Sequence, residues 1–369
     1  MKTIRRLIYG EVLRSVAFIT LGFLALFFFF DFVEELRTIG RNTSPGYHLV
    51  QALTFVALMV PSHLYELLPI TVLIGTIFVM ARLAQSSEYT ILRTSGLGPW
   101  RALTTLLVLG LGFVLLTFAV GDYLSPLSDR TGQLLKARYQ GRITVGQTGA
   151  WLKEKQQYTQ YAANVAALAS DGSMRGVRIF EFDSKGYLLS TTHAASARFA
   201  DGDDAWILQQ VDRSEFSTRA LDTARIERSQ LMNYRWPTRI TAEMVSAALL
   251  KPERMSTIDL FQYMRHLENN GQSAQRYEIE FWKKVFYPLS CLVMVVLALP
   301  FAYLHFRSGG IATYVFGGVM AGISFFLLNN VFGYMGNLQN WQPWLTAALP
   351  GLIYSVLSLA AFGWLVLRR

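Results

Sequence analysis

Two arginines four residues apart, Arg37 and Arg41, are candidates for binding a charged ligand. On a continuous helix they lie on one face, and a guanidinium can hold two phosphate oxygens in bidentate geometry. The alternative is that they pair with Glu34 or Glu35, one turn earlier. The sequence therefore predicts a phosphate-binding site here, with the neighbouring carboxylates sharing bridging divalent cations.

Histidine and acidic residues in or near the apolar runs can each be interpreted in two ways, as structural or as functional groups. His63 and Glu66 lie one turn apart at membrane depth, where a proton relay is conceivable and a polar contact between helices is preferred. Asp31, Glu34 and Glu35 could coordinate cations, although a solvated cluster at the membrane surface is the preferred interpretation. The five histidines are scattered and show no metal-ligand spacing.

The sequence contains no motif for nucleotide binding or hydrolytic chemistry. It has no G-x-x-x-x-G-K-[ST], no G-x-S-x-G and no H-E-x-x-H. The single cysteine, Cys291, excludes an intrachain disulfide and a cysteine metal cluster. We therefore expect no enzyme and no cofactor bound by this chain.

A polar interval at residues 81–101 separates two apolar runs. Ser87 is expected to N-cap a helix that begins at Glu88, Gly96 to end it in a left-handed conformation, and Pro99 to begin the next helix. The predicted helix has about eight residues, which is marginal in water without a packing partner. Its shape suits docking into a groove on a soluble protein, and the alternative is a tight, well-capped connection.

Composition places the chain in a membrane. Its 369 residues are 52% hydrophobic, 14% aromatic and only 16% charged, whereas soluble domains average about 25% charged residues. The net charge of +9 would suggest nucleic acid for a soluble protein, but much of the excess lies beside apolar runs and no nucleic-acid-binding motif is present.

Six apolar runs predict six spans, three on each side of a polar insert. They cover residues 9–36, 52–81, 102–120, 286–304, 311–334 and 344–367. The second run contains Pro61 and Pro69, which neighbouring helices can accommodate. The fifth is rich in glycine, which permits close helix packing.

The insert reads as an all-antiparallel β domain, most simply a sandwich or jelly roll. Strands are predicted at residues 176–183, 187–192 and 205–211, between turn signals at 170–172, 183–186 and 201–204. Ser256 and Asp259 then form a capping box for a connecting helix that Gly271 ends. We therefore divide the chain into helices at 1–130 with a cytoplasmic helix near 84–97, a β domain at 131–252, a connecting helix at 253–275 and helices at 276–369.

Basic residues predict the topology. Ten lie in the segments assigned to the cytoplasm, and the two short outer loops hold only Arg37 and Arg41. The ten are Lys2, Arg5, Arg6, Arg14, Arg82, Arg93, Arg101, Arg307, Arg368 and Arg369. The bias places both termini in the cytoplasm and the β domain outside.

These features together resemble the LptF/LptG permease family, the membrane subunits of the bacterial lipopolysaccharide exporter. The similarity covers essentially the whole chain, and its most specific stretches are residues 82–96 and 255–272. The second stretch, with residues 275–277 and 281–284 after it, favours the LptG branch. The resemblance implies a multi-pass protein of the bacterial inner membrane with a periplasmic jelly roll.

The resemblance also implies the partners and the sites. The partners are an LptB-type ATPase dimer that binds ATP and Mg²⁺, an LptF-type permease, an LptC-type single-span protein, an LptA-type periplasmic bridge and lipopolysaccharide. The helix at 84–97 becomes the coupling helix, with Ser87, Glu88, Tyr89, Arg93 and Gly96 as candidate ATPase-coupling residues. Candidate substrate contacts are Arg37, Arg41, Phe325 and Phe326, the arginines binding the lipid A phosphates.

One feature departs from the family, because its LptG members often carry lysines where this chain has Asp31, Glu34 and Glu35. Two other classes remain alternatives. A membrane-anchored periplasmic assembly factor would need no cytoplasmic docking helix. An ion-coupled transporter that works alone usually shows intramembrane charges and repeat symmetry. Within the family, the alternative to the LptG branch is the LptF-type paralogue.

Overall fold

The structure is a computed structural model that describes residues 2–37, 39, 47–140, 150–169, 172–200, 205–217, 225–242, 244–245, 252–303 and 311–364. The chain divides into two compact units. The helical unit comprises residues 1–34, 56–128 and 278–369, and the β unit comprises residues 35–55 and 129–277. The predicted site residue Arg41 and the turn signal at 201–204 lie outside the described residues.

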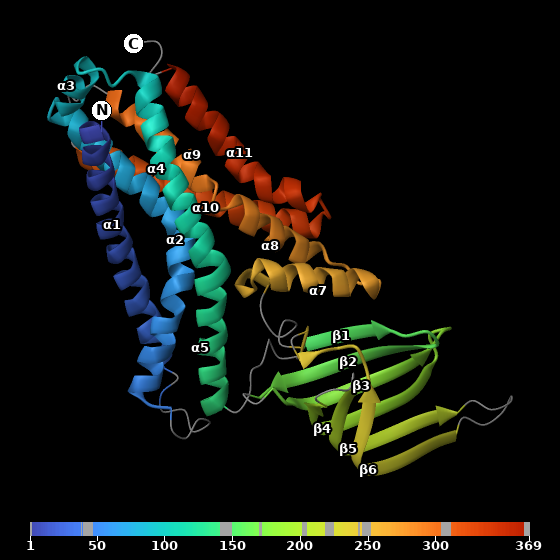
Figure 1. Ribbon diagram of the computed structural model, residues 1–369. Coiled ribbons are helices and arrows are strands. Elements are labelled where there is room, and N and C mark those ends of the chain that lie inside the picture. Colours follow the sequence, from blue (N-terminus) through green and yellow to red (C-terminus); the bar gives the residue numbers. More distant parts are fainter. Residues whose placement is uncertain are drawn as a thin grey trace. The chain divides into compact units, whose positions relative to one another are not determined.

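The helices follow the predicted apolar runs closely (Figure 1). They are α1 (Lys2–Leu36), α2 (Leu49–Gln85), α3 (Glu88–Thr94), α4 (Pro99–Ala119), α5 (Ser125–Gln140), α7 (Thr257–Asn269), α8 (Gln275–Phe286), α9 (Ser290–Ala298), α10 (Ile311–Leu338) and α11 (Pro343–Phe362). A π-helical turn (Val120–Leu124) joins α4 to α5, and short 3-10 segments lie at Pro252–Arg254 and Leu299–Tyr303. Both internal prolines of α2, Pro61 and Pro69, lie within the helix as expected.

Among the described residues, five helices are long and apolar enough to cross a membrane, or six if one bent pair counts as a span. The bent pair is α8 with α9 and the 3-10 segment after it, which meet at 46°. The sequence predicted a continuous span from residue 286. The break falls at Pro288, whose nitrogen has no hydrogen to continue the helical ladder.

The third helical segment is longer than predicted. We expected helix to end near residue 123 and β structure to begin after 130, but helix continues through the π-helical turn to Gln140. The polar residues Gly121, Asp122 and Tyr123 end the apolar run without ending the helix. Hydropathy marks the limit of burial in lipid, whereas hydrogen bonding determines where a helix stops.

Glycines of α10 allow its close approach to α2 and α11, as the sequence predicted. A Cβ atom at Gly322 would lie 2.8 Å from Ile70 Cγ2, and one at Gly318 would lie 2.7 Å from Ile77 Cδ1. Gly336 contacts Thr346 in the same way. By contrast, a Cβ at Gly317 would meet nothing within 4 Å.

Side chains of the bent pair bind backbone carbonyls of α2 and of the π-helical turn. The Tyr287 hydroxyl donates to the Glu66 carbonyl at 2.6 Å, and Lys284 Nζ donates to the Gly121 carbonyl at 2.9 Å. Lys284 is only 8% exposed. These bonds join segments more than 160 residues apart in sequence, so no local pattern around Lys284 predicts them.

The β unit contains one six-stranded antiparallel sheet in the order β1-β2-β3-β4-β5-β6 (Figure 1). Its strands are β1 (Ala150–Lys155), β2 (Thr159–Leu168), β3 (Met174–Asp183), β4 (Leu188–Phe199), β5 (Ala205–Ser217) and β6 (Arg225–Pro237). The antiparallel class and the three predicted strands are confirmed. The sheet is a simple meander in the described residues, and jelly-roll connectivity stays a prediction.

The connecting helix α7 is capped as the sequence predicted. Ser256 accepts a hydrogen bond from the Asp259 N–H, and the Asp259 carboxylate accepts one from the Ser256 N–H. Leu260, Tyr263 and Leu267 are buried along one face. Gly271 ends the segment in a left-handed conformation (φ +64°), which glycine adopts without steric cost.

We expect Gly322→Leu to loosen the contact between α10 and α2. Overpacking of a tight contact typically costs about 1–3 kcal/mol, so the midpoint temperature of unfolding in detergent should fall. The matched control is Gly317→Leu, because both glycines lie inside α10 and only Gly322 has a close neighbour. Equal midpoints for the two variants would show that the α10–α2 contact is not tight.

Candidate functional site

The polar interval between α2 and α4 forms the short helix α3, one residue shorter than the eight expected. It begins at Glu88 as predicted, but the Ser87 side chain makes no capping hydrogen bond. Ser87 has a left-handed backbone (φ 60°, ψ 4°), whereas a capping serine normally has an extended one. The Ser87 carbonyl instead accepts bonds from the N–H groups of Thr90 and Ile91.

The end of α3 has the two hydrogen bonds of a Schellman motif. The Gly96 N–H donates to the Arg93 carbonyl, and the Leu97 N–H donates to the Leu92 carbonyl, both at 3.1 Å. Gly96 has φ +100°, which confirms the predicted left-handed stop. Pro99 is the first residue of α4 as expected. The chain therefore leaves α3 in a defined direction.

Tyr89 anchors α3 to the helical unit. Its side chain is 3% exposed and its ring lies 5.2 Å from that of Tyr303, edge to face. The Arg93 guanidinium lies over the same Tyr303 ring at 5.6 Å. Burial raises the pKa of the Tyr89 phenol well above its ordinary value, so Tyr89 stays neutral at physiological pH. Its position suits an anchor better than a contact with a partner.

Most of the other side chains of α3 are exposed, and Leu92 packs partly buried against the same cluster as Tyr89. Glu88, Thr90, Arg93 and Thr94 are exposed, and Ile91 is 63% exposed. Trp100, at the start of α4, is also 63% exposed. The exposed side of α3 thus presents Glu88 and Ile91, while Tyr89 holds its inner side, and Trp100 is exposed nearby at the start of α4.

The acidic residues at the end of α1 do not form one solvated cluster, because Glu35 is buried and paired within the β unit. Glu35 is 5% exposed and accepts a 2.8 Å hydrogen bond from Tyr47 and a 2.9 Å ion pair from Lys136. Lys136 Nζ also lies 4.4 Å from the centre of the Phe55 ring. Both carboxylate oxygens of Glu35 are therefore occupied by partners other than Arg37, which is exposed just beyond α1.

Lys136 and Tyr47 were missed by sequence reasoning. Lys136 is 101 residues from Glu35 and lay in a segment interpreted as β structure, so no local pattern linked the two.

His63 forms the predicted polar contact between helices, with a different partner. Its Nε2 atom lies 2.6 Å from Asp31 Oδ2 and joins α2 to α1. The Phe27 ring lies 5.0 Å from the imidazole. In the described part of the chain, no group of three or more histidine, cysteine or acidic side chains is placed to hold a metal ion.

The two candidate phenylalanines of α10 differ in environment. Phe325 is 3% exposed and packs between Tyr287 and Tyr354, with ring centres at 6.3 and 5.1 Å. Phe326 is 36% exposed. Phe326 is therefore accessible to a lipid, and Phe325 stabilises the helix packing.

Two apolar helices have faces that the described residues do not cover. In the most apolar stretches of α1 and α10, 11% and 17% of the residues are buried, against 83% in α2. The exposed side chains of α1 include Phe18 and Leu21, and those of α10 include Phe316 and Tyr334. In a bilayer these faces contact lipid, a partner helix or an amphiphilic substrate.

Apolar helices with open faces, a fixed short helix between two of them and a β-sheet insert define a polytopic membrane protein. The comparisons identify the family. The profile of the lipopolysaccharide export system permease LptF/LptG matches residues 6–367, and the chain belongs to this family.

Two relatives carry the name lipopolysaccharide export system permease protein LptG. The protein of Escherichia coli K12 is 28% identical over 92% of this chain and 90% of its own length. The protein of Haemophilus influenzae is 25% identical over 100% of this chain and 99% of its own length. Both confirm the resemblance to the LptG branch.

We expect Tyr89→Ala to release α3 from the helical unit. Removing a buried aromatic ring typically costs about 3–5 kcal/mol, so amide hydrogen exchange at Ile91 and Leu92 should accelerate at least tenfold. Thr90→Ala, which alters an exposed neighbour on the same helix, serves as the control. Unchanged exchange in Tyr89→Ala would mean that other contacts hold α3.

Proposed function

We propose that this chain is a permease subunit of an ATP-driven lipopolysaccharide exporter. In this proposal it extracts lipopolysaccharide from the outer leaflet of the inner membrane and passes it to a periplasmic β-jelly-roll bridge. The placement of α3 carries the proposal. Tyr89 fixes the helix inward while Glu88 and Ile91 remain exposed, as a docking element for a soluble ATPase requires.

Extraction needs an external source of energy. Exposing acyl chains to water costs about 0.8 kcal/mol per CH₂ group, which thermal motion does not supply for a lipid with several chains. The family membership supports a non-catalytic role. We assign ATP and Mg²⁺ to an LptB-type ATPase dimer, with Ser87, Glu88, Arg93 and Gly96 of this chain at its surface.

The open faces of α1 and α10 support a cavity shared between two subunits. We assign an LptF-type permease as the second half, and an LptC-type span and an LptA-type bridge as the further partners. Tight packing around α2 gives the chain a rigid centre. Both termini and α3 are assigned to the cytoplasm and the β unit to the periplasm, because of the charge bias.

The substrate headgroup is assigned to Arg37, together with Arg41. Arg37 is exposed, and the neighbouring Glu35 is already paired with Lys136. The acidic residues are therefore not assigned a cation. Phe326 is the aromatic residue of α10 that we place against acyl chains.

Replacing Arg37 with alanine is expected to weaken lipopolysaccharide capture. A charge-assisted hydrogen bond contributes about 1.5–3 kcal/mol, so photo-crosslinking of the lipid should fall about tenfold or more. Arg37→Lys should lose less, because the charge remains while the bidentate geometry is lost. Arg228→Ala, at an exposed position of β6, is the control. Equal crosslinking in Arg37→Ala and the wild type would place the headgroup elsewhere.

The docking role is tested with Glu88→Ala. Loss of a carboxylate paired across a partly desolvated interface costs about 2–5 kcal/mol, so binding of the purified ATPase and stimulation of its activity should drop. An exposed carboxylate at a helix start stabilises that helix by only about 0.3–1 kcal/mol, so the protein should still insert and fold.

Thr90→Ala is the control for a neutral change on α3. If Glu88→Ala inserts normally and binds and stimulates the ATPase at the wild-type level, Glu88 does not couple the two proteins. If the wild-type chain binds no ATPase, the proposed permease function is wrong and the alternative function, a membrane-anchored assembly factor, is favoured.

A further inference from the structure

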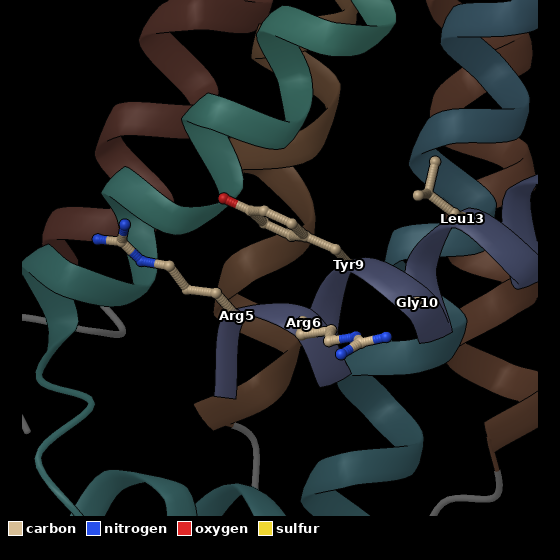
Figure 2. Close-up of a pocket in the computed structure, with 5 residues that line it drawn as sticks. All are labelled: Arg5, Arg6, Tyr9, Gly10 and Leu13. Atoms are coloured by element: carbon tan, nitrogen blue, oxygen red, sulfur yellow. The ribbon is translucent and has the colours of Figure 1, made fainter. Parts of the chain in front are cut away.

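A shallow hollow of about 450 Å³ lies at the first turns of α1 and is lined by Arg5, Arg6, Tyr9, Gly10 and Leu13. Figure 2 shows Arg5 and Tyr9 on one side of α1, with Arg6 on the other side of the turn, beside Gly10. The volume is roughly fifteen times the ~30 Å³ of a water molecule in the liquid. It therefore has room for a small polar headgroup.

The two arginines have no ion-pair partner in the described part of the chain. The nearest carboxylate along α1 is that of Glu11, which lies 3.7 Å from Arg14 and 2.6 Å from Arg82. Both Arg5 and Arg6 are exposed. The hollow consequently carries two positive charges that this helix does not neutralise.

The apolar part of the hollow continues along α1. Ile8 and Val12 turn inward at 2% and 0% exposure, whereas Leu13 is 49% exposed. Gly10 leaves a notch, because a Cβ there would meet nothing within 4 Å. An acyl chain can lie over Gly10 and Leu13 towards Leu21, which is 66% exposed.

We propose that this hollow binds an anionic phospholipid, with its charged headgroup over the first turns of α1 between Arg5 and Arg6 and an acyl chain over Gly10 and Leu13. The Tyr9 phenol is placed to donate a hydrogen bond on the Arg5 side. Basic pockets at the cytoplasmic end of membrane helices bind such headgroups. The inference rests on the proposed function in one respect: the assignment of the N-terminus to the cytoplasm, which means that the lipid comes from the cytoplasmic leaflet.

The test uses the full chain in phosphatidylcholine nanodiscs that contain increasing amounts of phosphatidylglycerol with a photoreactive acyl chain. We expect crosslinks in the peptide that covers residues 5–21. Arg5→Gln with Arg6→Gln should raise the half-saturating lipid concentration about twenty-fivefold, because each arginine near an anionic surface contributes about fivefold.

Two further variants separate charge from shape. Gly10→Leu keeps both arginines and fills the notch, so it should reduce crosslinking at Leu13 by tenfold or more. Arg14→Gln removes one charge from the same helix outside the hollow, and Arg14 is already paired with Glu11. It should change the half-saturating concentration less than twofold.

Three results would overturn the proposal. They are unchanged lipid capture in the double glutamine variant, equal competition by phosphatidylcholine, and crosslinks that fall outside residues 5–21. The assay contains neither ATP nor lipopolysaccharide. Its failure is therefore distinguishable from failure of Glu88→Ala to uncouple the ATPase.

Discussion

The helical unit depends on satisfying backbone carbonyls where its helices are interrupted. A bilayer offers no water to an unpaired carbonyl, so another part of the protein must supply the donor. Pro69 has no N–H to give to the Tyr65 carbonyl, one residue before the carbonyl that Tyr287 binds. At the π-helical turn, Lys284 supplies a donor to Gly121, which in turn lacks the Cβ that would collide with the Tyr65 ring. The bent fourth segment thus binds a carbonyl next to the one that Pro69 leaves without a donor in α2, and a carbonyl of the π-helical turn after α4.

This arrangement gives the helical unit a well-packed centre and open edges. The core cluster combines residues of α1, α2, α4 and α9, while most of α1 and α10 is left uncovered. A centre of this kind lets α3 transmit displacement, because Tyr89 and Leu97 belong to the same buried cluster. Under the proposed function, motion at the ATPase would reach the open faces through packed side chains and not through flexible loops.

Charges follow a similar division between internal pairs and free cations. Asp31 pairs with His63, Glu35 with Lys136, and Glu11 with Arg82. These three acidic residues are used within the chain, and exposed arginines remain at the two ends of α1. A guanidinium that has no carboxylate partner in the described residues is well suited to a phosphate. The proposed binding of anionic lipids at both ends of α1 follows from this single distribution.

The sequence by itself determined the elements whose cause is local. Apolar length placed the membrane helices, the capping box at Ser256 and Asp259 began α7, and Gly96 and Gly271 ended helices in left-handed conformations. Only the tertiary structure decided which side chains meet across long separations. The bonds of Lys284 to Gly121 and of Lys136 to Glu35 connect residues 163 and 101 positions apart. The break at Pro288 has a local cause, because proline has no N–H for the helical ladder, whereas the donors that Lys284 and Lys136 supply come from segments that no local sequence pattern links to their acceptors.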